Sequence, residues 1–263
     1  MPLHDLFEDL RSRGRKALIP YVTAGFPDSR AFVEILHAVD ASEADVVEVG
    51  IPFSDPMADG PAIQAASERA LAGGASLART LDLLATARLR KPVVLMSYLN
   101  LILQFGFDAF ARTASAGGVA GVVVPDLPLE ESPDLDRALG ATGIDLIGMI
   151  APTTPEARIR AIASRFRGFL YLISRTGVTG TRRDLGEGLG RLVRRARSCT
   201  DRPICVGFGI STPAQAAEAS KESSGVIIGS ALIELIGRSG TDAAAAVGRA
   251  LTGYRGAIDG STP

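Results

Sequence analysis

Eight short apolar segments recur along the 263 residues, and each is bounded by residues typical of turns. They are rich in Val, Ile and Leu and do not alternate with polar residues, which is the pattern of parallel strands covered on both faces. The segments are Ala17–Ala24, Val46–Gly50, Val93–Tyr98, Gly121–Asp126, Leu146–Ala151, Phe169–Ser174, Ile204–Gly209 and Gly225–Ser230. We therefore expect eight buried strands joined by longer connections.

The connections between these segments have the spacing of amphipathic helices. Ala31–Val39 and Leu189–Ala196 both place apolar residues three and four positions apart. Eightfold alternation of strand and helix predicts an α/β fold, the (β/α)8 TIM barrel. A doubly wound open sheet is the alternative, but it has fewer strands and a glycine-rich first turn, which the sequence at residues 25–28 does not provide.

Two further helical stretches and one extra helix complete the predicted organisation. Four apolar residues ahead of the first strand fall on one helix face, namely Leu3, Leu6, Phe7 and Leu10. We expect this helix to cap the bottom of the barrel. The long interval between the second and third strands holds a loop and then helices near Ala62–Leu71 and Leu77–Leu89. Because no linker or low-complexity segment interrupts the pattern, residues 1–263 are predicted to form a single domain.

Charge and composition exclude several classes of function. The chain has 28 Lys and Arg against 29 Asp and Glu, a balance that excludes a broad basic face for nucleic acid. Its two histidines and two cysteines form neither a metal-ligand pattern nor a disulfide framework. The sequence contains no apolar run long enough for a membrane helix, and its charged start does not resemble a signal peptide. We expect a cytoplasmic protein that binds neither membrane nor metal.

Glu48 is the first candidate catalytic residue. It lies inside the otherwise apolar segment Val46–Gly50, at the strand end where such barrels place their active sites. A buried carboxylate without a partner costs several kcal/mol, so pairing with a basic residue of a neighbouring strand is the alternative. None of the predicted strands contains Lys or Arg, which favours catalysis. Burial would raise the pKa of this carboxyl toward neutrality, where it can both give and accept a proton.

Two more acids follow in the loop after this strand. Asp59 precedes Gly60-Pro61, so it is either a functional carboxylate or the N-cap of the next helix. Asp55 precedes a proline and is either functional or a turn residue. The presence of three acids on one strand end and its loop favours a functional reading of this loop.

Glycines after the last three strands indicate a phosphate site. They occur in Thr176–Gly180, in Gly207–Gly209 and at Gly229-Ser230, where backbone N–H groups and a helix start could bind an anion. Plain turns are the alternative for each segment alone. The long polar segment Ser174–Asp184 is either a loop or a lid over the substrate. Tyr98, Asp126 and Tyr171 also lie at strand ends, as substrate contacts or as rim packing.

Several long motifs resemble the tryptophan synthase alpha subunit family. The most specific is Val47–Pro61, which reads VEVGIPFSDPMADGP. Four other segments also match, namely Tyr21–Gly25, Pro125–Glu131, Ser174–Gly180 and Gly207–Ser211. Together they cover nearly the whole chain, although it departs from the family pattern at Leu101, Ser42-Glu43 and Ser223-Ser224.

The resemblance implies a retro-aldol cleavage of indole-3-glycerol phosphate to indole and glyceraldehyde 3-phosphate. Glu48 would be the acid and base, and Asp59 would stabilise charge at the indole N–H. The implied phosphate-binding residues are Gly180, Gly209, Gly229 and Ser230. The implied indole-pocket residues are Tyr21, Met96, Val123, Tyr171, Thr179 and Phe208, to which we add Tyr98 as a substrate contact from its place at a strand end.

The resemblance also implies a partner. The family works with a tryptophan synthase beta subunit that carries pyridoxal phosphate and consumes the indole, in an alpha2-beta2 complex, while the alpha chain itself holds no cofactor. Asp55 would meet a lysine of that partner and couple the two sites. A stand-alone lyase that releases indole is the main alternative. Intact Glu48 and Asp59 argue against an inactive regulatory barrel, and the acidic loop argues against a sugar-phosphate isomerase.

Overall fold

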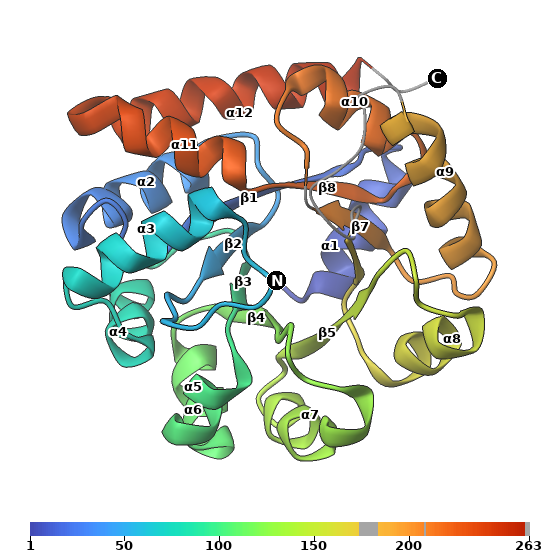
Figure 1. The fold of residues 1–263 in the computed structure, drawn as a ribbon, viewed down its shortest axis with the longest axis horizontal. Coiled ribbons are helices and arrows are strands. Elements are labelled where there is room, and N and C mark those ends of the chain that lie inside the picture. The colour runs from blue at the N-terminus through green and yellow to red at the C-terminus, as the bar shows by residue number, and fades with distance from the viewer. Residues whose placement is uncertain (174–183, 208, 261–263) are drawn as a thin grey trace.

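Eight parallel strands close into a barrel in chain order, and helices α2 to α12 lie around its outside (Figure 1). This computed structural model describes residues 1–173, 184–207 and 209–260. The strands are β1 (Ala17–Thr23), β2 (Val47–Gly50), β3 (Val93–Met96), β4 (Val119–Val123), β5 (Asp145–Ile150), β6 (Leu170–Ile173), β7 (Ile204–Gly207) and β8 (Gly225–Ile228). Strand β1 pairs with both β2 and β8, which closes the ring and confirms the predicted (β/α)8 barrel.

The helices alternate with the strands, with a doubled connection after β2 and another after β3. They are α1 (Leu3–Ser12), α2 (Ser29–Ala41), α3 (Pro61–Ala72), α4 (Leu77–Ala87), α5 (Leu99–Phe105), α6 (Phe107–Ala116), α7 (Pro133–Gly140), α8 (Glu156–Arg165), α9 (Asp184–Arg197), α10 (Pro213–Glu222), α11 (Ser230–Ser239) and α12 (Ala243–Asp259), with short 3-10 turns at Leu129–Glu131 and Gly240–Asp242. The predicted split between α3 and α4 is confirmed, since α3 ends before Gly73.

Several predicted strands extend too far toward their carboxyl ends. The segment Val93–Tyr98 was expected as strand, but β3 ends at Met96 and Tyr98 is already the N-cap of α5. The apolar pattern reports burial, and Tyr98 is 2% exposed although it lies outside the sheet. Tyr98 therefore stays buried while the backbone leaves the ladder to begin α5.

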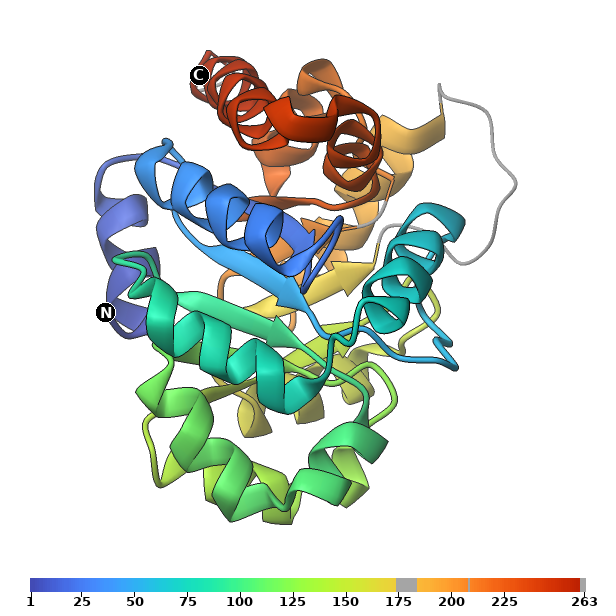
Figure 2. The same cartoon turned by 90° about the vertical axis from the view of Figure 1, so that its left-hand side faces the viewer.

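Helix α1 closes the amino-terminal end of the barrel, as predicted. Figure 2 shows it beside the ends at which the strands begin. Its four apolar residues are all buried. Leu3 packs close to Gly121 of β4, and the ring of Phe7 lies 5.5 Å from that of Phe169, just before β6. Because this end is filled by side chains, the opposite end is the one where the strands can present polar residues.

The last helix is fixed to the barrel by a buried cation. Arg255 of α12 is 1% exposed and pairs with Asp45, just ahead of β2. Its guanidinium also donates to the backbone oxygens of Lys16 (3.0 Å) and Glu43 (3.1 Å). These bonds join the C-terminal helix to the beginnings of β1 and β2, so the first and last parts of the chain form one body.

Candidate active site

Glu48 is a buried acid without a neutralising partner. It lies on β2 opposite Tyr21 of β1 and is 1% exposed. Neither carboxylate oxygen has a hydrogen-bond partner within the described part of the chain, so the predicted alternative of a basic partner from a neighbouring strand is wrong there. Burial, and then the nearby carboxylate of Asp59, raise the pKa of Glu48 from 4.5 to about 8. The carboxyl is therefore protonated at neutral pH and titrates close to it.

Asp59 is held at the same end of the barrel by Tyr98. The Tyr98 hydroxyl accepts a hydrogen bond from the Ala58 N–H (3.0 Å) and donates to Asp59 Oδ2 (3.2 Å). Burial raises the pKa of Asp59, and the bond from Tyr98 opposes this by favouring the charged form. The capping alternative is wrong, because the N-cap of α3 is Gly60 and no side chain caps that helix.

Two tyrosines of the barrel interior lie next to these acids. Burial raises the pKa values of Tyr21 and Tyr171 well above their ordinary range, and the negative charges of Asp59 and Glu48 add to the effect at both. Each ring lies over a glycine of a neighbouring strand. A Cβ at Gly50 would lie 2.0 Å from the Tyr21 hydroxyl, and one at Gly207 would lie 2.5 Å from the Tyr171 ring. These glycines leave the space that the two aromatic rings need.

Apolar residues at the carboxyl ends of β3 and β4 also lie buried at the end of the barrel that holds the two acids. Met96 is the last residue of β3 and Val123 the last of β4, paired with each other in register. Met96 is 5% exposed and Val123 is fully buried. Their placement at strand ends is compatible with the predicted wall of an aromatic-ring pocket, and that role stays a prediction.

The late glycines also lie at this end. Gly229 is the N-cap of α11, whose first residue is Ser230, and a Cβ at Gly229 would lie 3.8 Å from Tyr21. Gly209 follows β7 with a φ of +83°, a conformation that other residues rarely adopt. The start of α11 is a suitable anion site, since its first N–H groups are free of helix bonds. It borders the ring of Tyr21 and thus the acidic centre.

Three predicted site residues fall outside the described residues. Thr179 and Gly180 belong to residues 174–183, which make up most of the segment Ser174–Asp184 predicted as a loop or a lid, and Phe208 follows β7. Their roles stay predictions. Asp126 is described, and its carboxylate accepts the Leu99 N–H at 2.9 Å. Asp126 therefore holds the start of α5, which is a structural contact at the rim of the barrel.

The loop after β2 contains one residue that sequence reasoning missed. Phe53 stacks on Tyr98, with ring centroids 5.0 Å apart and an angle of 29° between the planes. Tyr98 thus holds this loop twice, by stacking on Phe53 and by its bonds to Ala58 and Asp59. Asp55 lies between these anchors, exposed, and accepts a hydrogen bond from its neighbour Ser54 at 2.5 Å. In the sequence, the only indication that Phe53 has a role was its position as an aromatic residue within the acidic motif after β2.

The described residues contain no group of three or more His, Cys, Asp or Glu side chains that could hold a metal ion. None of their helices has both the length and the apolar character that a membrane crossing requires. The functional groups at the open end are thus two carboxyls in different environments, aromatic rings and a free helix start. Fold and site together define the class as a (β/α)8-barrel enzyme with a buried and a partly buried carboxyl, in different environments, at its open end.

Comparison with known proteins gives the particular family. Residues 7–258 match the family model described as tryptophan synthase alpha chain. Curated relatives include the tryptophan synthase alpha chains of Synechococcus elongatus, 47% identical over 98% of this chain and 97% of the relative, and of Gloeobacter violaceus, 47% identical over 88% and 85%. The chain belongs to the tryptophan synthase alpha chain family.

Solved structures agree with this assignment. The tryptophan synthase alpha subunit of Legionella pneumophila superimposes with a TM-score of 0.91 at 37% identity, covering 98% of both chains. A chain of tryptophan synthase from M. tuberculosis, in its aminoacrylate-bound form, superimposes with a TM-score of 0.87 at 33% identity, over 97% of this chain and 98% of that one. The predicted fold, family and reaction class are therefore confirmed together.

Proposed function

We propose that this chain cleaves indole-3-glycerol phosphate to indole and glyceraldehyde 3-phosphate, with Glu48 moving the protons and Asp59 stabilising the charge on the indole ring. The observation that carries the assignment is the buried Glu48 carboxyl, whose pKa is raised to about 8, close to neutral pH. A group with such a pKa can give a proton in one step and take one back in the next. It needs no metal or cofactor to do so.

The reaction requires two proton transfers around one carbon–carbon bond. In the first, protonated Glu48 gives its proton to C3 of the indole ring, and the ring nitrogen takes up positive charge. In the second, the Glu48 carboxylate removes the proton from the hydroxyl on the side-chain carbon next to the ring. The bond between that carbon and C3 breaks, its electron pair returns to the ring, and the carbonyl of glyceraldehyde 3-phosphate forms. Glu48 ends the cycle protonated, as it began.

Asp59 supplies the negative charge that the intermediate needs. Positive charge develops at the indole nitrogen only after protonation of C3, so a nearby carboxylate stabilises the intermediate more than the substrate. The bond from Tyr98 favours the charged form of Asp59, against the effect of burial, and fixes its position before the substrate binds. The two acids therefore have separate roles, set by separate environments: one without hydrogen-bond partners, the other tied to a tyrosine.

The remaining residues suit the two ends of the substrate. The rings of Tyr21 and Tyr171, with Met96 and Val123, would hold the indole. Gly209, Gly229 and Ser230, with Gly180, would hold the phosphate through backbone N–H groups. Gly229 adjoins Tyr21, which is the juxtaposition that a substrate with a ring at one end and a phosphate at the other requires.

Steady-state turnover of the isolated chain tests the reaction itself. Incubation with indole-3-glycerol phosphate should release indole and glyceraldehyde 3-phosphate in equal amounts, without any added metal or cofactor. Indole is measured by extraction and absorbance, and the aldehyde by a coupled dehydrogenase. Unequal release of the two products, or no release with and without a beta subunit, would contradict the proposal.

We also infer that a tryptophan synthase beta subunit with pyridoxal phosphate is the partner, in an alpha2-beta2 complex, and that Asp55 couples the two sites. Asp55 is exposed between the two points at which Tyr98 holds the loop, so a contact there can shift Asp59. Asp55→Ala should leave the slow cleavage by the isolated chain nearly unchanged. It should remove about tenfold or more of the stimulation by the beta subunit, within the usual range of coupling energies.

The measurement is the cleavage rate with saturating beta subunit, with complex formation checked separately by sedimentation. Asp82→Ala is a matched control for loss of a surface acid, because Asp82 is an exposed acid within α4. Unchanged stimulation in Asp55→Ala would remove the coupling role, and absence of any beta complex would favour a stand-alone lyase.

The predicted single domain over residues 1–263 and the cytoplasmic location stay predictions.

A further inference from the structure

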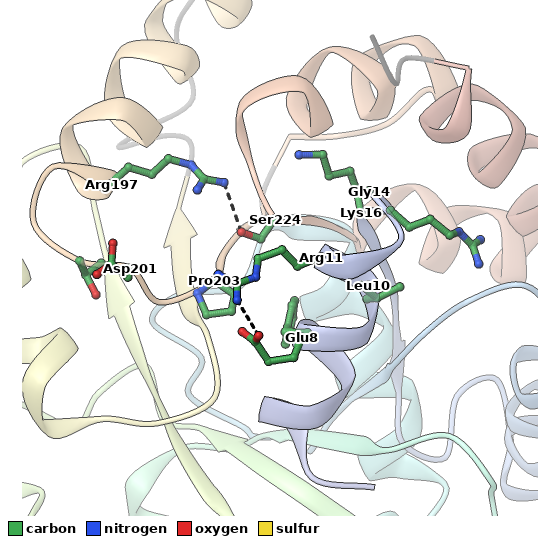
Figure 3. A pocket seen from close by; sticks show the side chains of 12 residues that line it. Glu8, Leu10, Arg11, Gly14, Lys16, Arg197, Asp201, Pro203 and Ser224 are labelled. Carbon is green, nitrogen blue, oxygen red and sulfur yellow. Dashed lines mark hydrogen bonds and ion pairs between the residues drawn. The ribbon is translucent and has the colours of Figure 1, made fainter.

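A second pocket opens at the end of the barrel opposite the acids. It has a volume of about 450 Å³ and lies between α1, the residues that follow α9, and the segments that precede β1, β7 and β8. It is lined by Phe7, Glu8, Leu10, Arg11, Gly14, Arg15, Lys16, Arg197, Thr200, Asp201, Pro203 and Ser224. Figure 3 shows Arg197 and Asp201 on one side, Glu8, Leu10 and Arg11 of α1 on the other, and Ser224 and Pro203 between them.

Two of the cations in this pocket form no direct ion pair with a carboxylate of the described residues. Lys16 Nζ donates to the backbone oxygen of Ser223 at 3.0 Å. Arg197 donates to the backbone oxygen of Glu222 (3.0 Å) and to the Ser224 hydroxyl (3.3 Å). Within the described residues neither forms an ion pair, whereas Arg11 and Arg15 both do. Burial and then the charge of Arg197 lower the pKa of Lys16, although Glu222 opposes this, as expected for cations placed close together.

Hydroxyl groups beside these cations add further donors. The Ser224 hydroxyl accepts from the Ile204 N–H (3.1 Å) and from Arg197. The Thr200 hydroxyl accepts from the Arg202 N–H (3.1 Å). Since both oxygens serve as acceptors here, the hydroxyl protons remain available to a ligand. Two cations and two hydroxyl donors around one space match the oxygens of a phosphate group better than those of a single carboxylate.

An apolar surface adjoins this cluster of donors. Phe7 and Leu10 of α1 line the pocket from the barrel side and are each 4% exposed, and Pro203 lies between α1 and Arg197. The acids at the rim are Glu8, which is already paired with Arg11, and Asp201. A ligand with a negatively charged group and a small apolar part would therefore use both halves of the pocket.

We propose that this pocket binds a small organic phosphate monoester, with the phosphate held by Lys16, Arg197, Ser224 and Thr200 and the organic part lying on Leu10 and Pro203. The site is separate from the phosphate site proposed at Gly209 and Gly229, which lies at the other end of the strands. It adds a second ligand-binding position to the barrel, next to the beginnings of β1, β7 and β8.

The test is a titration of the whole chain, followed through backbone amide NMR shifts. Phenyl phosphate and inorganic phosphate are the two probes. The amides of Gly14, Lys16 and Ser224 report on this pocket, and those of Gly209 and Gly229 report on the catalytic end. We expect saturable shifts at the first set, with phenyl phosphate reaching half-saturation at a lower concentration than inorganic phosphate because its ring covers apolar surface.

Ser224→Asp is the decisive variant. An acid at this position would pair with Lys16 and Arg197 and repel a phosphate, so half-saturation at the pocket amides should rise by about tenfold or more. Ser76→Asp adds the same charge at the N-cap of α4, where Asp also caps well, and should leave the titration unchanged. Cleavage of indole-3-glycerol phosphate by Ser224→Asp should match that of the unmodified chain, which separates this proposal from the proposed function.

Three results would overturn the proposal. The first is the absence of saturable shifts at Gly14, Lys16 and Ser224 with either probe. The second is an unchanged titration in Ser224→Asp, or in Arg197→Gln if the first variant does not fold. The third is equal half-saturation by the two probes, which would leave only a site for inorganic anions. In the first case, shifts confined to Gly209 and Gly229 would assign all phosphate binding to the catalytic end.

Discussion

Replacing Glu48 with glutamine should abolish cleavage and, at the same time, stabilise the protein at neutral and alkaline pH. Glutamine has the size of a protonated glutamate but cannot lose a proton. In the folded chain the pKa of Glu48 is about 8, whereas its ordinary value is 4.5. The folded state therefore keeps a proton that the unfolded state releases, and between these two values the unfolding free energy decreases as pH rises.

The size of this effect follows from the pKa shift. Each unit of pKa difference corresponds to about 1.4 kcal/mol, so from about pH 5.5 to about pH 7.5 the Glu48 carboxyl lowers the unfolding free energy by about 2.5 kcal/mol. Glu48→Gln does not show this decrease in unfolding free energy, because glutamine does not titrate. The variant should thus gain about 2.5 kcal/mol relative to the unmodified chain over that interval, while its cleavage rate decreases by about a hundredfold or more, as expected on removal of a general acid and base.

The assay is urea unfolding of both proteins across this pH interval, with the cleavage rate measured in parallel. Glu68→Gln makes the same chemical change at an exposed position of α3 and controls for loss of a negative charge. If the difference in unfolding free energy between Glu48→Gln and the unmodified chain stays the same at all pH values, the raised pKa of Glu48 is refuted. A cleavage rate within a few-fold of the original would refute the catalytic role.

Two other substitutions test the site's geometry. Asp59→Asn should reduce the cleavage rate by about a hundredfold, because an amide cannot balance the charge on the ring. The thermal midpoint should change little, since Gly60 and not Asp59 is the N-cap of α3. A cleavage rate close to the original would contradict the catalytic role of Asp59. Gly50→Ala should lower the unfolding free energy in urea by about 1–3 kcal/mol, because its Cβ would lie 2.0 Å from the Tyr21 hydroxyl and 2.5 Å from its ring. Adding Tyr21→Leu should recover more of this loss than adding Tyr21→Phe, and equal recovery would show that the ring is not the obstacle.

The open end of the barrel illustrates where sequence patterns succeed. Glu48 was recognisable because a carboxylate inside an apolar strand is costly to bury and none of the predicted strands contains Lys or Arg to pair with it. The glycines that we propose to bind phosphate were recognisable as a set because they recur after consecutive strands. The role of Tyr98 was not recognisable in detail. Its bonds to Ala58 and Asp59 join residues about 40 positions apart, and such pairings leave no trace in local spacing.

The alternative readings of Asp59 show the same limit. Both an N-cap and a catalytic carboxylate fit the letters Asp-Gly-Pro, since capping needs only an acid near a helix start. The capping interpretation failed because the Asp59 side chain points to Tyr98, the N-cap of α5. Likewise the pocket at the closed end combines residues from α1, α9 and the segment before β8, and no motif in the sequence unites them.

What the sequence determined by itself was the order of strands and helices, the cap at the barrel's closed end and the identity of the two acids. These depend on burial and local spacing, which periodicity reports directly. Tertiary structure alone decided where the strands end, which partners each acid has, and hence that Glu48 is protonated at neutral pH while Asp59 is held by a tyrosine. Those properties arise from desolvation and from contacts between distant segments, and both exist only once the barrel has closed.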